Sequence, residues 1–360
     1  MSMPKNQAGL VIKQEANFYS VAFEGTEYLC TMRANLKKGG RTIRVGDRVR
    51  LEDLHEERPV ISEILRRTSA LKKPAVANVD LVLLVMSGLN PDFNAMLVDR
   101  LLLCMLYEKL QPVICVNKAD LIDEELREWI EDEYGVFPLV FVSAESGEGL
   151  ETLKEILVDQ VTILAGASGV GKSSLVNALN PNIDMVTGEV NEKIGVGKHT
   201  TRHVSLHKVH HDGEVGWVAD SPGFSNVKLP PIDRAELSTY YPEFEPYLGQ
   251  CEFDDCLHDH EDGCAIKAHI DTDSERYYNY LRLLDEVKTL YKQRRDSSTK
   301  DEGLTKRAVG KNRKESVLKL GTEGRARSRR TQKQVIEQIS NWSDFDEESL
   351  EAMNPDEWRI

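Results

Sequence analysis

The sequence predicts a central α/β domain that is preceded by a small β-barrel and followed by a small, mostly helical domain. Three observations predict this fold class. Strand-like runs fill residues 8–66, strands and helices alternate over residues 76–227, and three cysteines and a histidine gather in residues 251–264. At 360 residues the chain is long enough for two or three domains.

The N-terminal region contains short apolar or alternating runs divided by glycines. These runs are Leu10–Lys13, Tyr19–Phe23, Tyr28–Arg33 and Arg48–Leu51. About five strands in some 60 residues fit a five-stranded OB-type barrel over residues 8–70. Six basic residues in its middle suit either a nucleic-acid backbone or ordinary charged strand edges, and both interpretations stay open. The six are Lys37, Lys38, Arg41, Arg44, Arg48 and Arg50.

The central region, residues 76–230, alternates buried strands with helices. Continuous apolar runs are typical of strands covered on both faces. The predicted strands are Val79–Met86, Pro112–Val116, Phe137–Val142, Val161–Ala165, Val204–Val209 and Gly216–Ala219. The predicted helices are Ala95–Leu110, Glu124–Tyr134, Leu150–Val158 and Lys172–Leu179. This alternation predicts a doubly wound α/β sheet.

A glycine-rich loop joins the strand Val161–Ala165 to the next helix and matches the pattern GxxxxGK[ST]. In this pattern backbone N–H groups wrap a phosphate, and glycines leave room for it. Lys172 can reach the β and γ phosphates of a nucleotide, and the Ser173 hydroxyl can ligate Mg²⁺. The predicted phosphate-binding residues are Gly166, Ala167, Ser168, Gly169, Val170, Gly171, Lys172, Ser173 and Ser174.

A second motif, Asn117-Lys118-Ala119-Asp120, ends a predicted strand and so lies at the carboxyl edge of the sheet, where ligands of such folds bind. NKxD resembles the guanine-specificity motif of the GTPase family. A carboxylate at Asp120 can accept two N–H bonds from guanine, and adenine lacks that paired donor edge. The Asn117 amide would bond near the base, and the Lys118 stem would cover its face.

Further elements resemble the remaining GTPase motifs. Ser143-Ala144, after another strand, resembles the supporting loop whose backbone N–H meets guanine O6. Asp220-Ser221-Pro222-Gly223 resembles DxxG, in which Asp220 would hold Mg²⁺ through water and the Gly223 N–H would sense the γ phosphate. Thr200 and Thr201 lie between the two phosphate motifs, and we assign Thr201 to Mg²⁺ and the γ phosphate.

The order of these motifs is rotated relative to ordinary GTPases, in which the phosphate loop comes first and NKxD comes late. Here NKxD and Ser143-Ala144 precede the phosphate loop, which precedes the threonines and DxxG. The same sheet forms if the chain is cut and rejoined elsewhere. The sequence therefore predicts a circularly permuted P-loop GTPase domain, and the segment after Gly223 would act as a lever on the C-terminal region.

Three cysteines and one histidine form a compact group in residues 231–300. The spacing is C-x4-C-x-H-x5-C, and the residues are Cys251, Cys256, His258 and Cys264. Three thiolates and an imidazole form a closed structural zinc set. The alternative is a chance cluster of reduced cysteines. We expect one structural Zn²⁺, because the segment is too polar to fold easily without metal.

The combination resembles the ribosome small-subunit-dependent GTPase family, RsgA type. The resemblance rests on the basic barrel, GASGVGKSS, DSPGF, HTTR at His199–Arg202 and the cysteine cluster, and covers residues 8–290. It implies late maturation of the small ribosomal subunit, rRNA contact through the barrel and zinc domains, and GTP hydrolysis that the subunit stimulates. It does not explain residues 301–360.

The residue that positions the attacking water is not given by the motifs. Phe224 follows Gly223 where many GTPases have glutamine, and phenylalanine has no suitable hydrogen-bonding group. The resemblance makes His199 the candidate beside Lys172 and Thr201, and a loop histidine without this role is the alternative. Gly169 stands where some potassium-assisted GTPases carry asparagine, so potassium activation is not expected.

We expect a cytoplasmic protein. No apolar run reaches the length that spans a bilayer, and Met1–Gly9 does not resemble a secretory signal. The net charge is −14, but residues 301–334 hold 11 Lys/Arg against four Asp/Glu. This basic part of a charged, flexible tail either is simply solvated or contacts RNA phosphates. We expect a monomer that binds Zn²⁺ and Mg²⁺ with GTP.

Two other functions compete with an assembly GTPase. One is a nucleotide-gated RNA-binding switch that acts on another RNA, and the partner that accelerates GTP consumption distinguishes the two. The other is a kinase that uses the phosphate loop, which explains neither NKxD nor the cysteine cluster.

Overall fold

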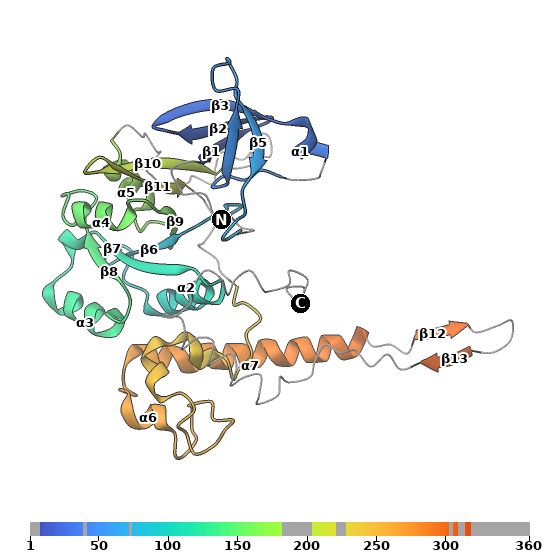
Figure 1. Ribbon diagram of the computed structural model, residues 1–360. Helices are drawn as coiled ribbons and strands as arrows, with labels where there is room; N and C mark the ends of the chain where they lie inside the picture. Colours follow the sequence, from blue (N-terminus) through green and yellow to red (C-terminus); the bar gives the residue numbers. More distant parts are fainter. Residues whose placement is uncertain are drawn as a thin grey trace, which may run out of the picture. The chain divides into compact units, whose positions relative to one another are not determined.

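The computed structural model in Figure 1 divides the chain into two compact units, Met1–Lys292 and Gln293–Ile360. The first unit contains the barrel, the α/β domain and the cysteine cluster. The structure describes residues 8–38, 42–71, 74–181, 204–220, 228–301, 305–308 and 314–317.

Five strands close the N-terminal barrel, and a short helix, α1 (Ala34–Lys38), follows the third. The strands are β1 (Gly9–Glu15), β2 (Phe18–Phe23), β3 (Thr26–Met32), β4 (Arg48–Glu52) and β5 (Val60–Ile64). Strand β1 pairs with both β2 and β4, and β3 pairs in parallel with β5, so the sheet returns to its first strand. This closure confirms the OB-type barrel. Its interior is filled by fully buried side chains that include Val11, Val21, Val49 and Ile61.

The basic residues of the barrel divide into two groups. Arg44 donates from Nη1 to the Leu71 carbonyl at 3.2 Å, and Arg48 is half-buried, which lowers its pKa. Arg50 is exposed and forms an ion pair with Glu63 at 3.6 Å. Arg44 therefore has a structural contact, Arg48 is partly covered, and Arg50 keeps its charge at the surface. The side chains of Lys37, Lys38 and Arg41 lie outside the described residues.

The α/β domain contains a six-stranded sheet in the order β10-β11-β9-β6-β7-β8. Within it the neighbouring strands are parallel except β10 and β11, which are antiparallel. All seven residues of β6 are buried, as its continuous apolar run predicts. The strands are β6 (Leu81–Ser87), β7 (Gln111–Asn117), β8 (Leu139–Val142), β9 (Val161–Ala165), β10 (Ser205–His211) and β11 (Glu214–Asp220).

Helices cover both faces of this sheet (Figure 1). Helices α2 (Ala95–Tyr107) and α3 (Glu124–Tyr134) share one core with Val82 and Leu84 of β6. Helices α4 (Leu150–Leu157) and α5 (Lys172–Leu179) share the other core with Leu81, Leu83 and Val85 of the same strand. This confirms the doubly wound sheet, because alternate residues of β6 enter opposite layers.

The sheet order brings the two predicted nucleotide motifs to one edge. Strand β9 leads into the glycine-rich loop, and β7 leads into Asn117-Lys118-Ala119-Asp120 and the short helix η2 (Ala119–Leu121). Only β6 separates these two parallel strands. Their carboxyl ends therefore meet at the same edge, although NKAD comes first in the chain.

The C-terminal part of the first unit is mostly helical. It contains η3 (Leu237–Tyr240), η4 (Pro242–Tyr247), α6 (Ala265–His269) and the start of α7 (Glu275–Asp301). The rings of Tyr241 and Tyr280 each lie 5.1 Å from the ring of Phe244, centroid to centroid. This core also includes Leu103 and Cys104 of α2, so the helical part packs directly on the α/β domain.

A buried arginine joins the two parts. Arg276 of α7 is 4% exposed and donates to Asp99 of α2 at 2.7 Å. Its other guanidinium atoms bond both carboxylate oxygens of Glu243 in η4, at 2.6 and 3.0 Å. The carboxylate of Glu133, in α3, accepts the backbone N–H groups of Glu275 and Arg276. The start of α7 is therefore fixed to two helices of the α/β domain.

The second unit contains the end of α7 and a two-stranded antiparallel hairpin, β12 (Thr305–Ala308) and β13 (Lys314–Val317). From the sequence we expect residues 301–360 to form a charged tail, and this hairpin is not predicted. None of the helices in the described ranges combines the length and the apolar character that crossing a bilayer requires.

Replacing Arg276 by methionine should lower the free energy of unfolding by about 3–5 kcal/mol, because it leaves the buried Asp99 carboxylate without its cation and the half-buried Glu243 without its partner. Urea denaturation of the full chain measures this change. Arg282→Met is the matched control on the same helix, since Arg282 is exposed and only stacks on Tyr278 at 5.7 Å. Its cost should stay within about 1 kcal/mol. Equal costs for the two variants would contradict the structural role of Arg276.

Candidate functional site

Glycines shape the loop between β9 and α5. Gly166 has φ 142°, and a Cβ atom there would lie 2.0 Å from the Val85 carbonyl oxygen. Gly171 has φ 92°, and a Cβ atom there would lie 2.3 Å from the Asn117 amide nitrogen. No larger residue fits either position without moving its neighbours. Two glycines of GxxxxGKS thus lie where a side chain would collide, one against β6 and one against the end of β7.

Lys172 begins helix α5 and turns back over the loop. Its ammonium donates to the carbonyls of Gly166 and Ala167 at 3.0 and 2.6 Å. Burial lowers the pKa of Lys172, and a bound phosphate anion would act in the opposite direction. Ser173 and Ser174 follow in the first turn, half-buried and exposed respectively. The ammonium and the N-terminus of the helix together favour an anion at this edge.

Asn117 connects the two nucleotide motifs. It is 1% exposed at the end of β7. Its amide nitrogen donates to the carbonyl of Val170, inside the glycine-rich loop, at 2.9 Å. Its amide oxygen accepts the Ala144 N–H at 3.2 Å. The sequence predicts that this amide bonds near the base. In the structure its nitrogen contacts the glycine-rich loop and its oxygen contacts the Ser143-Ala144 loop.

Two other residues of NKAD, Lys118 and Asp120, are more exposed than the buried Asn117. Lys118 has φ 62° and is half-buried, and Asp120 is exposed in the short helix η2. The Lys118 ammonium donates to the carbonyl of Asn90, in the loop after β6. Asp123, three residues beyond Asp120, has a different role, because it caps α3 by accepting the Leu126 N–H at 2.9 Å.

The Ser143-Ala144 loop is held by its own hydrogen bonds. Ser143 is fully buried, and its hydroxyl oxygen accepts the N–H groups of Glu145 and Ser146 at 3.3 and 3.0 Å. A backbone N–H of this loop is predicted to meet guanine O6, and the N–H of Ala144 donates to Asn117. The loop therefore lies beside NKAD, because it follows β8, the strand that pairs with β7.

The predicted switch residues are only partly described. Asp220 is the last residue of β11 and is paired with Ser205 at the start of β10. The Asp220 side chain is outside the described part. His199, Thr200, Thr201, Gly223 and Phe224 also lie outside the described residues.

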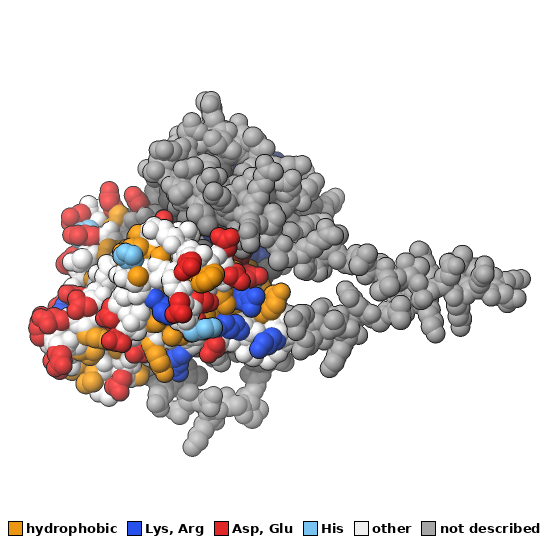
Figure 2. Space-filling model, turned by 90° about the horizontal axis from the view of Figure 1, so that it is seen from below, with side chains coloured by type: hydrophobic (Ala, Val, Ile, Leu, Met, Phe, Trp, Pro, Cys, Tyr) orange, Lys and Arg blue, Asp and Glu red, His pale blue; other side chains and the backbone are white. Residues whose placement is uncertain are grey.

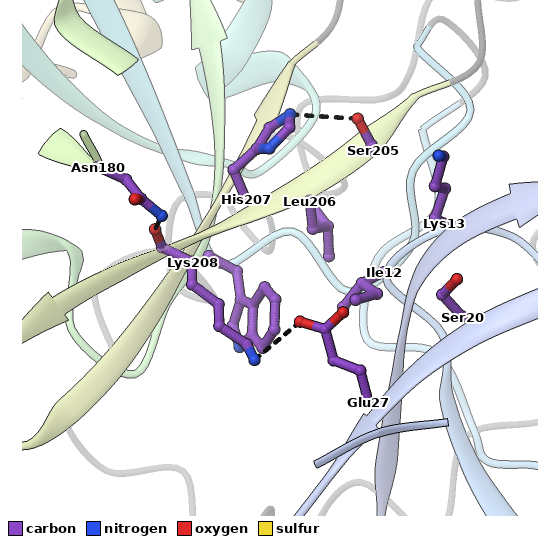
Figure 3. Close-up of a pocket in the computed structure, with 10 residues that line it drawn as sticks. Ile12, Lys13, Ser20, Glu27, Asn180, Ser205, Leu206, His207 and Lys208 are labelled. Atoms are coloured by element: carbon purple, nitrogen blue, oxygen red, sulfur yellow. Dashed lines mark hydrogen bonds and ion pairs between the residues drawn. The ribbon is translucent and has the colours of Figure 1, made fainter. Parts of the chain in front are cut away.

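Strand β10 connects this site with the barrel, and a cavity of about 410 Å³ lies beside the junction (Figure 3). Ser205 pairs with Lys13 of β1. Lys208 forms an ion pair with Glu27 of the barrel at 2.8 Å, and its carbonyl accepts from Asn180, at the end of α5, at 2.8 Å. No local sequence pattern predicts this junction, because the barrel residues and the β10 residues that meet there are far apart in the chain.

The cysteine cluster forms one compact group. The ligand atoms of Cys251, Cys256, His258 and Cys264 all lie within 4.8 Å of one another. His258 Nδ1 is 3.6 Å from Cys251 Sγ and 3.5 Å from Cys264 Sγ, and these two sulfurs are 4.0 Å apart. Tetrahedral Zn²⁺ with bonds of roughly 2.0–2.3 Å separates its ligands by about 3.5–3.8 Å. The cluster fits a metal ion of this kind.

Neighbouring groups fix the cluster from outside. The Glu261 carboxylate accepts the N–H groups of Leu257 and Asp259, both at 2.9 Å, which orders the turn around His258. Tyr277 of α7 donates to the His258 carbonyl at 2.9 Å. Burial raises the pKa of Cys256 to about 12, and a bound cation would favour its thiolate. The histidine of the set is thus held against the long helix.

Comparisons with known proteins agree with this arrangement. The family model described as RsgA GTPase matches residues 58–230, and the RsgA N-terminal domain matches residues 8–61. A relative from Carboxydothermus hydrogenoformans, named small ribosomal subunit biogenesis GTPase RsgA, is 40% identical over 284 residues, which are 78% of this chain and 97% of the relative. One of the same name from Moorella thermoacetica is 39% identical with the same coverage.

Two solved structures are also similar. YjeQ from Thermotoga maritima has a TM-score of 0.65 and 36% identity, over 78% of this chain and 98% of that one. YloQ, titled a circularly permuted GTPase, has a TM-score of 0.62 and 32% identity, over 78% of this chain and 95% of that one. With the glycine-rich loop, NKAD and the cysteine cluster in place, the chain belongs to the RsgA family of GTPases.

Proposed function

We propose that this protein hydrolyses GTP to GDP and phosphate in a Mg²⁺-dependent reaction, and that it acts in late maturation of the small ribosomal subunit. One observation carries the proposal. The Asn117 amide bonds the Val170 carbonyl at 2.9 Å, so a guanine-recognition motif and a phosphate loop share one edge of the sheet. The names of the relatives, which are small ribosomal subunit biogenesis GTPases, support the biological role.

In this site base and phosphates bind to different segments. The Asp120 carboxylate would accept two N–H bonds from guanine, and Lys118 would cover the face of the base. Asn117, Ser143 and Ala144 would act by holding the base loops against the phosphate loop. The backbone N–H groups of residues 166–174 would wrap the phosphates, and the Lys172 ammonium would turn from the loop carbonyls to the β and γ oxygens.

Ser173 and Thr201 would hold Mg²⁺, and Asp220 would reach it through water. When bound, this ion would neutralise charge that develops on the phosphate oxygens. The Gly223 N–H would sense the γ phosphate. His199 would orient the attacking water, because Phe224 offers no hydrogen-bonding group there.

The zinc role would be structural. Cys251, Cys256, His258 and Cys264 would together supply four ligands to such an ion, which would leave no position for substrate. The ion would fix a polar turn to α7 through the Tyr277 bond to the His258 carbonyl. Leu229 and Ile232 lie in the core of the same helical part, only a few residues beyond the DxxG motif. Loss of the γ phosphate would thus pull directly on this part.

The partner of the proposed GTPase is the small ribosomal subunit with its rRNA. Figure 2 shows acidic side chains spread over the described surface of one face, as the net charge of −14 leads one to expect. RNA contact would therefore depend on local basic groups. Arg50 on the barrel and the basic segment 301–334 are the candidates, because Arg44 bonds the Leu71 carbonyl and Arg48 is less exposed than Arg50. We expect a cytoplasmic monomer.

Asp120→Asn should reduce GTP affinity by about a hundredfold or more and favour xanthine nucleotides, since the amide cannot accept from both guanine donors. Competition binding with GTP and XTP measures this preference. Asp123→Asn is the matched control, because Asp123 caps α3 and asparagine is an equally good cap. Unchanged GTP affinity in the Asp120 variant would refute the base assignment.

Purified small subunits should raise the single-turnover rate of GTP hydrolysis by roughly tenfold or more. His199→Ala should remove most of this increase and leave GTP binding intact, because the residue would act on water alone. The comparison requires the same assay with large subunits and with unrelated RNA. Fast turnover without any partner would argue against subunit stimulation, and acceleration by unrelated RNA would favour an RNA-binding switch.

Metal analysis of the purified chain should find one zinc ion per molecule. His258→Ala should lower this content and the thermal stability, because it removes one of four ligands. His260→Ala is the control in the same turn, since the His260 side chain is 84% exposed and lies outside the cluster. Equal zinc content in the two variants would exclude His258 as a ligand.

A further inference from the structure

The loop that follows β6, residues 88–93, is fixed at both ends. At its start the buried Ser87 hydroxyl donates to the Leu89 carbonyl at 2.6 Å. At its end the Phe93 ring packs on Trp129 and Tyr134 of α3, with centroids 5.9 and 5.7 Å away. We call this segment the β6–α2 loop. Its anchors give it a defined conformation although its middle is exposed.

The β6–α2 loop touches both nucleotide motifs. A Cβ atom on Gly88 would lie 2.0 Å from Ile122 Cγ2, so the loop packs tightly on the chain just after NKAD. On the other side, a Cβ atom on Gly169 of the phosphate loop would be in ordinary contact with Pro91, at 3.7 Å. The β6–α2 loop therefore lies between the base motif and the phosphate loop.

Asn90 gives this loop its polar contact with NKAD. Its backbone is left-handed, with φ 50°, a conformation that asparagine tolerates better than most residues. In this conformation its carbonyl oxygen accepts a hydrogen bond from the Lys118 ammonium. Lys118 is itself left-handed at the end of β7, so its long side chain leaves the sheet edge toward the loop.

We propose that Asn90 is a positioning residue for the guanine base. Its carbonyl would hold the Lys118 ammonium, and so keep the apolar Lys118 stem where the base stacks. A free lysine loses rotamer freedom when it covers a ligand, and a side chain that is already tethered loses less. This pre-organisation slows dissociation of the nucleotide. The inference rests on the proposed function, because it takes NKAD as the base site.

Two substitutions at Asn90 distinguish the effect of its backbone conformation from the effect of its side chain. Valine is β-branched and disfavours the left-handed backbone, so Asn90→Val should turn the carbonyl away from Lys118. Glycine keeps the conformation and the carbonyl, so Asn90→Gly is the conservative variant that should restore the wild-type behaviour. The readout is the dissociation rate of a fluorescent GDP, measured by stopped flow. Asn90→Val should release GDP roughly three- to tenfold faster.

A double-mutant cycle tests whether Asn90 acts through Lys118. Lys118→Met keeps the apolar stem and removes the ammonium. In that background Asn90→Val should cause no further increase of the GDP dissociation rate. Asp92→Ala is the control in the exposed middle of the same loop and should leave the rate unchanged. An equal increase with and without the Lys118 ammonium would overturn the proposal.

Three further outcomes of these experiments also bear on the role of Asn90. If Asn90→Val does not fold, Ser87→Ala replaces it, because the Ser87 hydroxyl holds the same loop through the Leu89 carbonyl, and it should also speed GDP release. Equal rates for the valine and glycine variants would reject the role of Asn90. A wild-type chain that binds no guanine nucleotide would instead reject the proposed function, so the two failures differ.

Discussion

The amide of Asn117 is the interaction on which the nucleotide site depends. It is buried, and each end is used once: the nitrogen donates to Val170 and the oxygen accepts from Ala144. A carboxylate or a shorter side chain could not make both bonds. The amide also explains Gly171, since a Cβ atom there would collide with it. One side chain therefore holds three loops in register before any ligand arrives.

The other parts attach to this core through a few long-range contacts. Strand β10 pairs with β11 and meets the barrel strand β1, and Lys208 adds an ion pair to Glu27. Arg276 of α7 joins the helical part with the cysteine cluster to α2 through Asp99. Both flanking parts are thus joined to the α/β domain by contacts between specific residues that lie far apart in the chain.

The sequence predicts best what depends on local pattern. Strand β6 is a continuous apolar run because both faces are covered, and the glycine-rich loop is predictable because its backbone admits few residues. Contacts between distant residues are not accessible in this way. Arg276 and Asp99 lie 177 positions apart, and no local pattern around either residue predicts that the two form an ion pair. Asn117 was predicted at the site, but its bonds to two loops appear only when the strands are assembled.

The permuted order has a consequence for synthesis of the chain. After the barrel strands, β6, β7 and β8 are the first strands of the α/β domain to be made, and they can pair with one another, with β6 at one edge. Each later strand then joins an open edge: β9 joins β6, β11 joins β9, and β10 joins β11. No strand has to be inserted between two that are already paired. The nascent chain can thus build its sheet outward from β6, and of the later strands only β10 is made before the strand that it joins, β11.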